Sequence, residues 1–66
     1  MTNSKLGAYF RTRRLARGLS LERMCGQLGY NVSTVSRWER GENYPNLTQL
    51  MDWMQVLGLE LTWRDA

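Results

Sequence analysis

Arginine and small polar side chains gather on one side of a short helical stretch near the middle of the chain. Residues 32–40, VSTVSRWER, place Val35 and Trp38 on one side of a helical wheel, with Glu39 near its edge. The opposite side carries Val32, Ser33, Ser36, Arg37 and Arg40. Small residues allow close approach to a ligand, and a guanidinium can donate a fork of hydrogen bonds to guanine O6 and N7. Taken alone, the stretch is also compatible with an ordinary amphipathic helix whose outer face meets water.

The residues before this stretch supply what is needed to present it outward. Ser20 is a suitable N-cap for a helix over residues 21–28, whose apolar residues repeat at helical spacing. Gly29 tolerates the positive φ of a sharp exit, Asn31 caps the next helix, and Gly41 ends it. Two short helices joined by a tight turn form a helix-turn-helix, whose second helix enters the DNA major groove.

A first helix is expected before this unit, over residues 5–17 and ending at Gly18. Its predicted inner side consists of Leu6, Tyr9, Phe10 and Leu15. Several arginines occupy the remaining positions. They form either a solvated surface or a set in which one or two residues touch phosphates beside the groove.

A fourth helix is expected over residues 47–57, after a loop that contains Pro45 and the capping residue Asn46. Its predicted core side follows the i, i+3, i+4, i+7 pattern, with Trp53 at the edge. The residues of this side are Leu47, Leu50, Met51, Met54 and Leu57.

The hydrophobic period changes from helical to alternating after Gly58. Leu59, Leu61 and Trp63 alternate with polar residues, which is typical of a strand. A lone strand leaves both backbone edges unpaired, so we expect residues 58–64 to pair with the same strand of a second copy about a two-fold axis. The alternative is a frayed or partly helical C-terminal segment.

Composition narrows the class of protein. The 66 residues predict a single domain, 1–66, with a small core, and the net charge of +3 comes from eight arginines and one lysine against six acidic residues. A basic balance favours an anionic partner. One cysteine and no histidine argue against a disulfide framework and against a Cys/His zinc site, and fit a reducing cytoplasm.

No catalytic or membrane signal is present in the sequence. There is no histidine, no glycine-rich phosphate loop and no nucleophile beside a plausible base, so we expect neither an enzyme nor a bound cofactor or metal. No apolar run is long enough to span a membrane, and residues 1–4 are too short and polar for a signal peptide.

The segment from Leu19 to Gly41, with the loop to Pro45, resembles the Cro/CI-like (XRE) helix-turn-helix regulators of phages and bacteria. The motif is LSLERMCGQLGYNVSTVSRWERG followed by P, and the resemblance extends over residues 5–57. It implies a mainly α, compact, four-helix, lambda-repressor-like DNA-binding domain. The ending VLGLELTW is similar to short members, including some antitoxins and phage-type autorepressors, whose last strand forms an intermolecular ribbon.

The resemblance also implies roles for individual residues. Base contacts would come from Val32, Ser33, Ser36 and Arg37, with Arg37 on guanine and Val32 on a thymine methyl. Phosphate contacts would come from Ser20, Asn31, Arg40, Asn43 and Tyr44. Arg14 of the first helix and Glu39 would form a structural ion pair. The dimer interface would include Leu59, Leu61 and Trp63.

Four positions depart from the family pattern, among them Tyr30, which replaces a common aliphatic residue. Leu21 stands where the family often has glutamine, and Val32 stands where it often has glutamine or arginine. Both changes remove polar contacts with DNA, so sequence recognition would depend more on Arg37 and on DNA shape. Cys25 replaces the common alanine; it is either a buried small residue or a redox switch.

These observations predict a homodimeric repressor that binds an inverted-repeat operator in double-stranded DNA and regulates its own operon. A second hypothesis is an antitoxin or other interaction module that neutralises a partner protein, based on the terminal strand and on Trp53 and Trp63 as exposed residues. Activation of transcription is a third.

Overall fold

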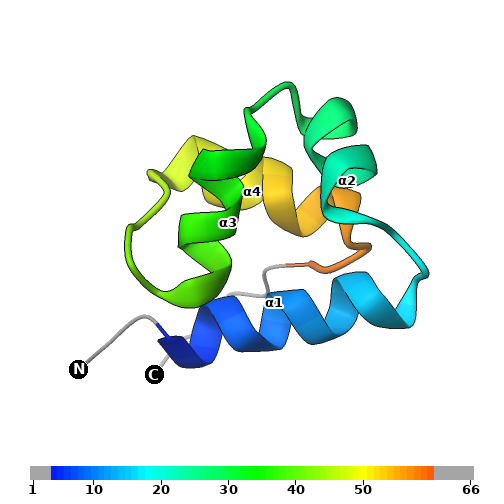
Figure 1. Ribbon diagram of the computed structural model, residues 1–66, viewed down its shortest axis with the longest axis horizontal. Helices are drawn as coiled ribbons and strands as arrows, with labels where there is room; N and C mark the ends of the chain where they lie inside the picture. The colour runs from blue at the N-terminus through cyan, green and yellow to red at the C-terminus, as the bar shows by residue number, and fades with distance from the viewer. Residues whose placement is uncertain (1–3, 61–66) are drawn as a thin grey trace.

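The computed structural model describes residues 4–60, which form four helices and no strand. The helices are α1 (Ser4–Ala16), α2 (Leu21–Leu28), α3 (Val32–Arg40) and α4 (Leu47–Val56). Helix α1 runs along one side of the molecule, α2 and α3 lie over it, and α4 closes the group behind α3 (Figure 1). The mainly α fold class is confirmed, and every helix boundary lies within one residue of its predicted position.

Side-chain caps fix where three of the helices begin. Ser20 Oγ accepts a hydrogen bond from the Arg23 amide at 3.1 Å, and Asn31 Oδ1 accepts one from the Thr34 amide at 2.8 Å. Asn46 and Gln49 form a reciprocal capping box, with distances of 2.8 and 2.9 Å. Each cap satisfies an amide that the first turn leaves without a helical partner, so short helices begin at defined residues.

The core is built around aromatic rings from three helices. Phe10 of α1 meets Trp53 of α4 edge to face, with ring centroids 4.4 Å apart, and Trp53 lies 5.4 Å from Trp38 of α3. Edge-to-face ring contacts stabilise the core beyond what the burial of apolar area alone provides. Four smaller side chains complete the buried core, namely Met24, Cys25, Val35 and Leu57.

The predicted core side of α4 is only partly right. Trp53 is not at the edge but fully buried, whereas Leu47 is 62% exposed and Met51 53% exposed. The helix is rotated so that its largest apolar side chain, Trp53, fills the space between Phe10 and Trp38. The rotation leaves Leu47 and Met51 on the outside.

The predicted inner side of α1 is also wrong at three of its four residues. Leu6, Tyr9 and Leu15 are exposed, and only Phe10 is buried. The buried side instead carries Gly7, Phe10 and Arg14, spaced three and four residues apart. A Cβ at Gly7 would overlap the carbonyl oxygens of Trp38 and Glu39, so the absence of a side chain lets α1 approach the end of α3.

The first residues of the predicted strand, 58–60, do not form a strand. Leu59 and Glu60 follow Gly58 without a strand partner, and Leu61 and Trp63 lie outside the described residues. Within residues 4–60, no helix has the length and apolar character needed to cross a membrane, and no group of three or more metal-ligating side chains is present.

Candidate nucleic-acid interface

Gly29 makes the turn between α2 and α3. Its φ is +80°, in the left-handed region, and its amide donates to the Cys25 carbonyl at 2.8 Å, which closes α2. Residues with a Cβ are strained in this region. Two residues later Asn31 caps α3, so the turn is short and has a defined exit direction.

Helix α3 is held from behind by its buried side. Val35, Trp38 and Glu39 are buried, in agreement with the helical wheel. The ring of Tyr30, which precedes the cap, meets Trp38 edge to face at 5.6 Å. The opposite side of α3 is therefore the one left available to a ligand.

Arg14 and Glu39 fasten α1 to the last turn of α3. Arg14 Nε donates to Glu39 Oε2 at 2.8 Å and Nη2 donates to Oε1 at 3.1 Å. Nη1 donates to the Leu19 carbonyl at 2.9 Å, and the hydrogen bonds to Glu39 raise the pKa of Arg14. A two-point contact fixes the relative orientation of both groups as well as their distance.

The four predicted base-contacting residues all lie on the outer side of α3. Val32, Ser33 and Arg37 are exposed, and Ser36 is half-buried. Ser33 Oγ donates to Asn31 Oδ1 at 2.9 Å, so its hydroxyl is oriented by the cap. The Arg37 side chain has no hydrogen-bond or ion-pair partner within residues 4–60, which leaves its fork of donors unused.

The predicted phosphate-contacting residues lie at the starts of α2 and α3, at the last residue of α3 and in the loop after it. Ser20 and Asn31 use their side-chain oxygens as cap acceptors, so anion binding there falls to the Ser20 O–H donor, to helix amides and to the Asn31 NH₂ group. Arg40 forms an exposed ion pair with Glu42, at 3.0 Å between Nε and Oε2. Asn43 Oδ1 accepts from the Tyr44 amide at 2.9 Å, and the Tyr44 side chain is exposed.

A contact that the sequence did not suggest joins the turn to α4. The hydroxyl of Tyr30 donates to Asp52 Oδ2 at 3.0 Å, so Tyr30 links α3, through Trp38, with α4. Burial, and then the hydrogen bond to Asp52, raise the pKa of Tyr30. The sequence signal is weak: one aromatic residue stands before a cap, and an acidic residue sits on the amphipathic helix.

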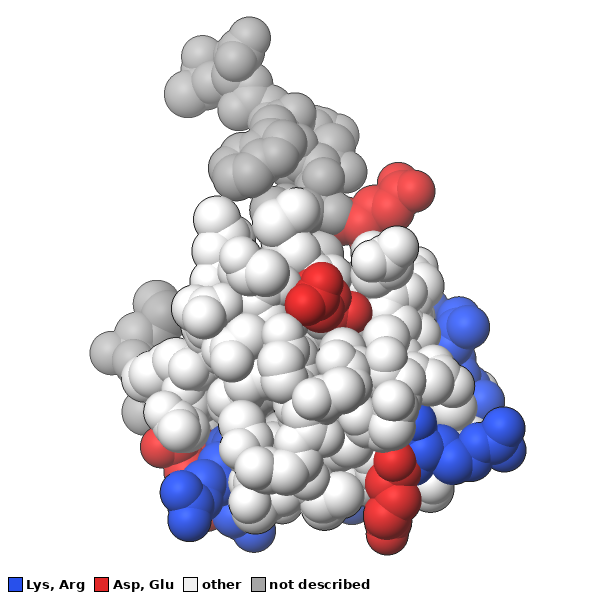
Figure 2. All heavy atoms as spheres, turned by 90° about the horizontal axis from the view of Figure 1, so that it is seen from above, with Lys and Arg blue, Asp and Glu red and all other residues white. Residues whose placement is uncertain are grey.

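Charged side chains are unevenly distributed over the surface. Figure 2 shows a face whose middle is covered by uncharged side chains, with acidic groups within it and lysine and arginine along its lower margins. An anionic partner is therefore favoured away from the middle of this face.

Cys25 is buried and belongs to the core. Burial raises the pKa of its thiol, so the reactive thiolate is disfavoured. Its environment fits a buried small residue better than a redox switch.

Comparisons with a family model and with solved structures both identify a helix-turn-helix domain. A family model described as a helix-turn-helix domain matches residues 5–66. The restriction-modification controller protein C.AhdI from Aeromonas hydrophila is 31% identical, with a TM-score of 0.83 and 88% of each chain covered. No curated protein sequence matches the chain.

Two further solved structures share the fold. The clp gene regulator ClgR from C. glutamicum is 23% identical over 91% of this chain and 78% of its own, with a TM-score of 0.83. The complex of HipA, HipB and O2-O3 contains a chain that is 22% identical over 98% of this chain and 92% of its own, with a TM-score of 0.81.

The chain belongs to the helix-turn-helix domain family. The match to a controller protein and the geometry of α2 and α3 confirm the resemblance to the Cro/CI-like type, a class of DNA-binding transcriptional regulators that are typically not enzymes.

Proposed function

We propose that this protein is a homodimeric, sequence-specific repressor that acts in the cytoplasm and has no catalytic activity. The observation that carries the proposal is the outer side of α3. The Arg37 side chain is exposed there without a partner within residues 4–60, and the helix is fixed from behind by Trp38 and Glu39. A rigid helix with an unused guanidinium is suited to reading a base edge, because its donors need not be released from another group.

The proposed mechanism is steric. Each subunit inserts α3, the recognition helix, into a major groove, and two half-sites about one helical turn apart, roughly 34 Å, form an inverted repeat. An operator that overlaps a promoter then excludes RNA polymerase. Regulation of its own operon is consistent with the likeness to a restriction-modification controller protein.

We assign base contacts to Val32, Ser33, Ser36 and Arg37 and phosphate contacts to Ser20, Asn31, Arg40, Asn43 and Tyr44. Exposure of Val32 and Arg37 supports the first set. The second set is supported by its position at the starts of α2 and α3, at the end of α3 and in the loop that follows. Residues 58–64 are assigned to the contact between subunits, outside the helical part 5–57.

An antitoxin role is the second candidate. The fold is shared with HipB, which occurs in a complex with HipA. Trp53, however, is fully buried and cannot serve as the exposed anchor expected from the sequence. DNA binding is the better-supported function for α3, and a protein partner would need another surface.

Selection of binding sites from random DNA duplexes tests the proposal. We expect enrichment of a roughly palindromic site bound by two chains, with preference relaxed at one base pair of each half-site when Arg37 is replaced by alanine. Failure to enrich any sequence would contradict the repressor proposal and favour the antitoxin role.

A further inference from the structure

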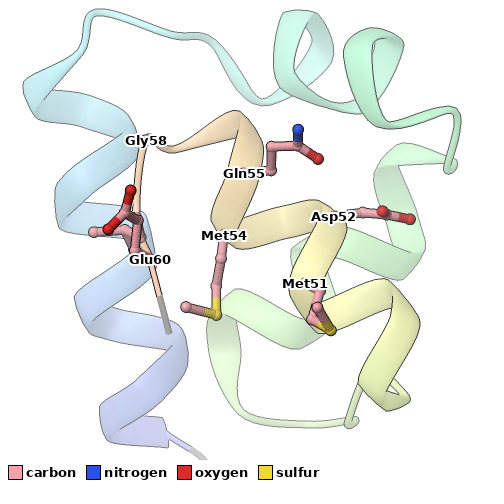
Figure 3. A pocket seen from close by; sticks show the side chains of 7 residues that line it. Met51, Asp52, Met54, Gln55, Gly58 and Glu60 are labelled. Atoms are coloured by element: carbon pink, nitrogen blue, oxygen red, sulfur yellow. The ribbon is translucent and has the colours of Figure 1, made fainter. Parts of the chain in front are cut away.

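A groove lies between α4 and the residues that follow it. Its apolar part is formed by Met51, Met54 and Leu59, and its acidic groups are Asp52 and Glu60. Figure 3 shows Met51 and Met54 projecting from α4, with Glu60 across from them on the segment after Gly58. Methionine is flexible and polarizable, so a methionine-lined groove can adapt to an aromatic side chain.

The end of α4 sets where the chain leaves the groove. Gly58 has a φ of +71°, its amide donates to the Gln55 carbonyl at 3.1 Å, and the Leu59 amide donates to the Met54 carbonyl at 2.8 Å. This pair of bonds is a Schellman motif, which usually brings the residue after the glycine against the last turn. Leu59 is packed on the core in this way, so the chain departs from the wall of the groove at Glu60.

The residues after Glu60 have the chemistry that the groove would accept. The sequence continues LTWR, so Leu61 and Trp63 share the alternation that begins at Leu59, and Arg64 adds a positive charge. Trp63 offers a large apolar ring to the two methionines, and Arg64 is complementary to Asp52 and Glu60. Acidic groups at the groove make DNA an unfavourable occupant.

A segment of the same chain would have to reverse direction to enter its own groove. Glu60 is part of the groove wall, and only Leu61 and Thr62 separate it from Trp63. Neither residue is a type that favours tight turns, and Thr favours extended backbone. In an extended conformation three residues would span about 10 Å, a length that favours reaching a second copy over folding back.

We propose that residues 61–64 of one copy occupy the groove of a second copy, with Trp63 against Met51 and Met54, and that the exchange is reciprocal. The inference rests on the homodimer of the proposed function and specifies how the two subunits are joined. A reciprocal exchange is isologous, as a two-fold dimer requires, because each copy gives the same segment and the same groove.

Complementation between two defective variants tests the exchange. Trp63→Ala removes the inserted ring, and Met51→Glu adds a charge to an exposed residue of the groove. We expect each variant alone to dimerise at least tenfold more weakly than the wild-type chain in sedimentation experiments without DNA. Their mixture should associate more strongly than either alone, because one intact segment meets one intact groove. A mixture no stronger than its components overturns the exchange.

Three controls distinguish the exchange from packing between helices and from misfolding of a variant. Leu47→Glu changes an exposed apolar residue of α4 that does not line the groove, so it should leave dimerisation unchanged. Loss of the dimer in this variant would indicate packing of α4 on α4 and overturn the exchange. Gln55→Arg, a second groove variant with opposite charge, should behave like Met51→Glu, and circular dichroism should show wild-type helix content for each.

The wild-type chain decides between failure of this inference and failure of the proposed function. A wild-type chain that is monomeric at all concentrations overturns the homodimer of the proposed function and the exchange with it. A dimeric wild-type chain whose Trp63→Ala variant melts at a lower temperature without a change in mass overturns the exchange alone. Site selection from random duplexes by the same wild-type chain tests DNA recognition separately.

Discussion

The guanidinium of Arg14 and the carboxylate of Glu39 meet through two hydrogen bonds, of 2.8 and 3.1 Å, inside the contact between α1 and α3. Both side chains are buried, and the third guanidinium nitrogen of Arg14, Nη1, donates to the Leu19 carbonyl. The pair therefore orients the end of α3 relative to α1. Each buried charge is compensated by the other, so the pair stabilises the fold only while both partners are present.

Removing one partner of this pair should be severely destabilising. Arg14→Met leaves the Glu39 carboxylate buried without its cation, at a cost of roughly 3–5 kcal/mol, which is comparable to what a core of this size supplies. Urea unfolding monitored by circular dichroism measures the loss. The double variant Arg14→Met/Glu39→Met should recover much of it, since two apolar side chains leave no uncompensated charge. A double variant as unstable as the single one would contradict this account.

Gly7→Ala should destabilise the fold although alanine is the better helix former. The new Cβ would overlap the carbonyl oxygens of Trp38 and Glu39, so α1 must move away from α3. Overpacking of this kind costs about 1–3 kcal/mol, against a gain of about 0.5–1 kcal/mol in helix propensity. Thermal unfolding measures the net change. Gly26→Ala, at a helix position with open space, is the matched control and should be stabilising.

Tyr30→Phe should loosen the turn while keeping its packing. The phenyl ring can still meet Trp38, but the hydrogen bond to Asp52 Oδ2 is lost. Amide hydrogen exchange at residues 29–32 should become faster, since the link from the turn to α4 is weakened. Tyr44→Phe, at an exposed tyrosine, should leave this exchange unchanged. Equal protection in both variants would show that the ring alone holds the turn.

Stability should fall at alkaline pH because of Cys25. Burial raises the pKa of the thiol above its ordinary value of 9.0, so the folded state binds a proton that the unfolded state releases. The stabilising contribution is complete below about pH 9 and is lost as the pH rises through the raised pKa. Cys25→Ala should reduce the slope of unfolding free energy against pH above 9. An unchanged slope would assign the alkaline loss to other groups, such as Tyr30.

Arg37→Ala and Arg40→Ala should affect DNA binding in different ways. Loss of a guanine contact by Arg37→Ala should cost about 1–3 kcal/mol on the selected operator and relax preference at one base pair. Arg40→Ala should weaken all sequences alike and reduce the slope of log K against log salt by about 1. Titrations of operator and unrelated duplexes at several salt concentrations separate the two. An unchanged base preference in Arg37→Ala would contradict the assignment of Arg37.

The helices and the turn could be predicted from the sequence because their signals are local. Caps such as Ser20, Asn31 and Asn46 and the exit residue Gly29 act within a few residues, so their effect does not depend on the rest of the fold. The inward side of α3 was also predictable, since Trp38 and Val35 are far more apolar than their neighbours on the helix.

The inward sides of α1 and α4 could not be predicted in the same way. Gly7 has no hydrophobicity to mark it, and its role emerges only when the backbone of α3 passes beside it. Trp53 is selected over Met51 because the space between Phe10 and Trp38 fits a large ring, which is a property of three helices together. The Tyr30–Asp52 hydrogen bond likewise depends on how α4 lies against the turn.

The division of α3 into a buried side and an outer side has a consequence for how such a protein can diversify. Val35, Trp38 and Glu39 maintain the fold, whereas Val32 and Arg37 contribute little to it. Under the proposed base contacts, substitutions on the outer side alter which DNA sequence is bound with little change in stability. New target preferences can arise by single mutations while the scaffold is retained.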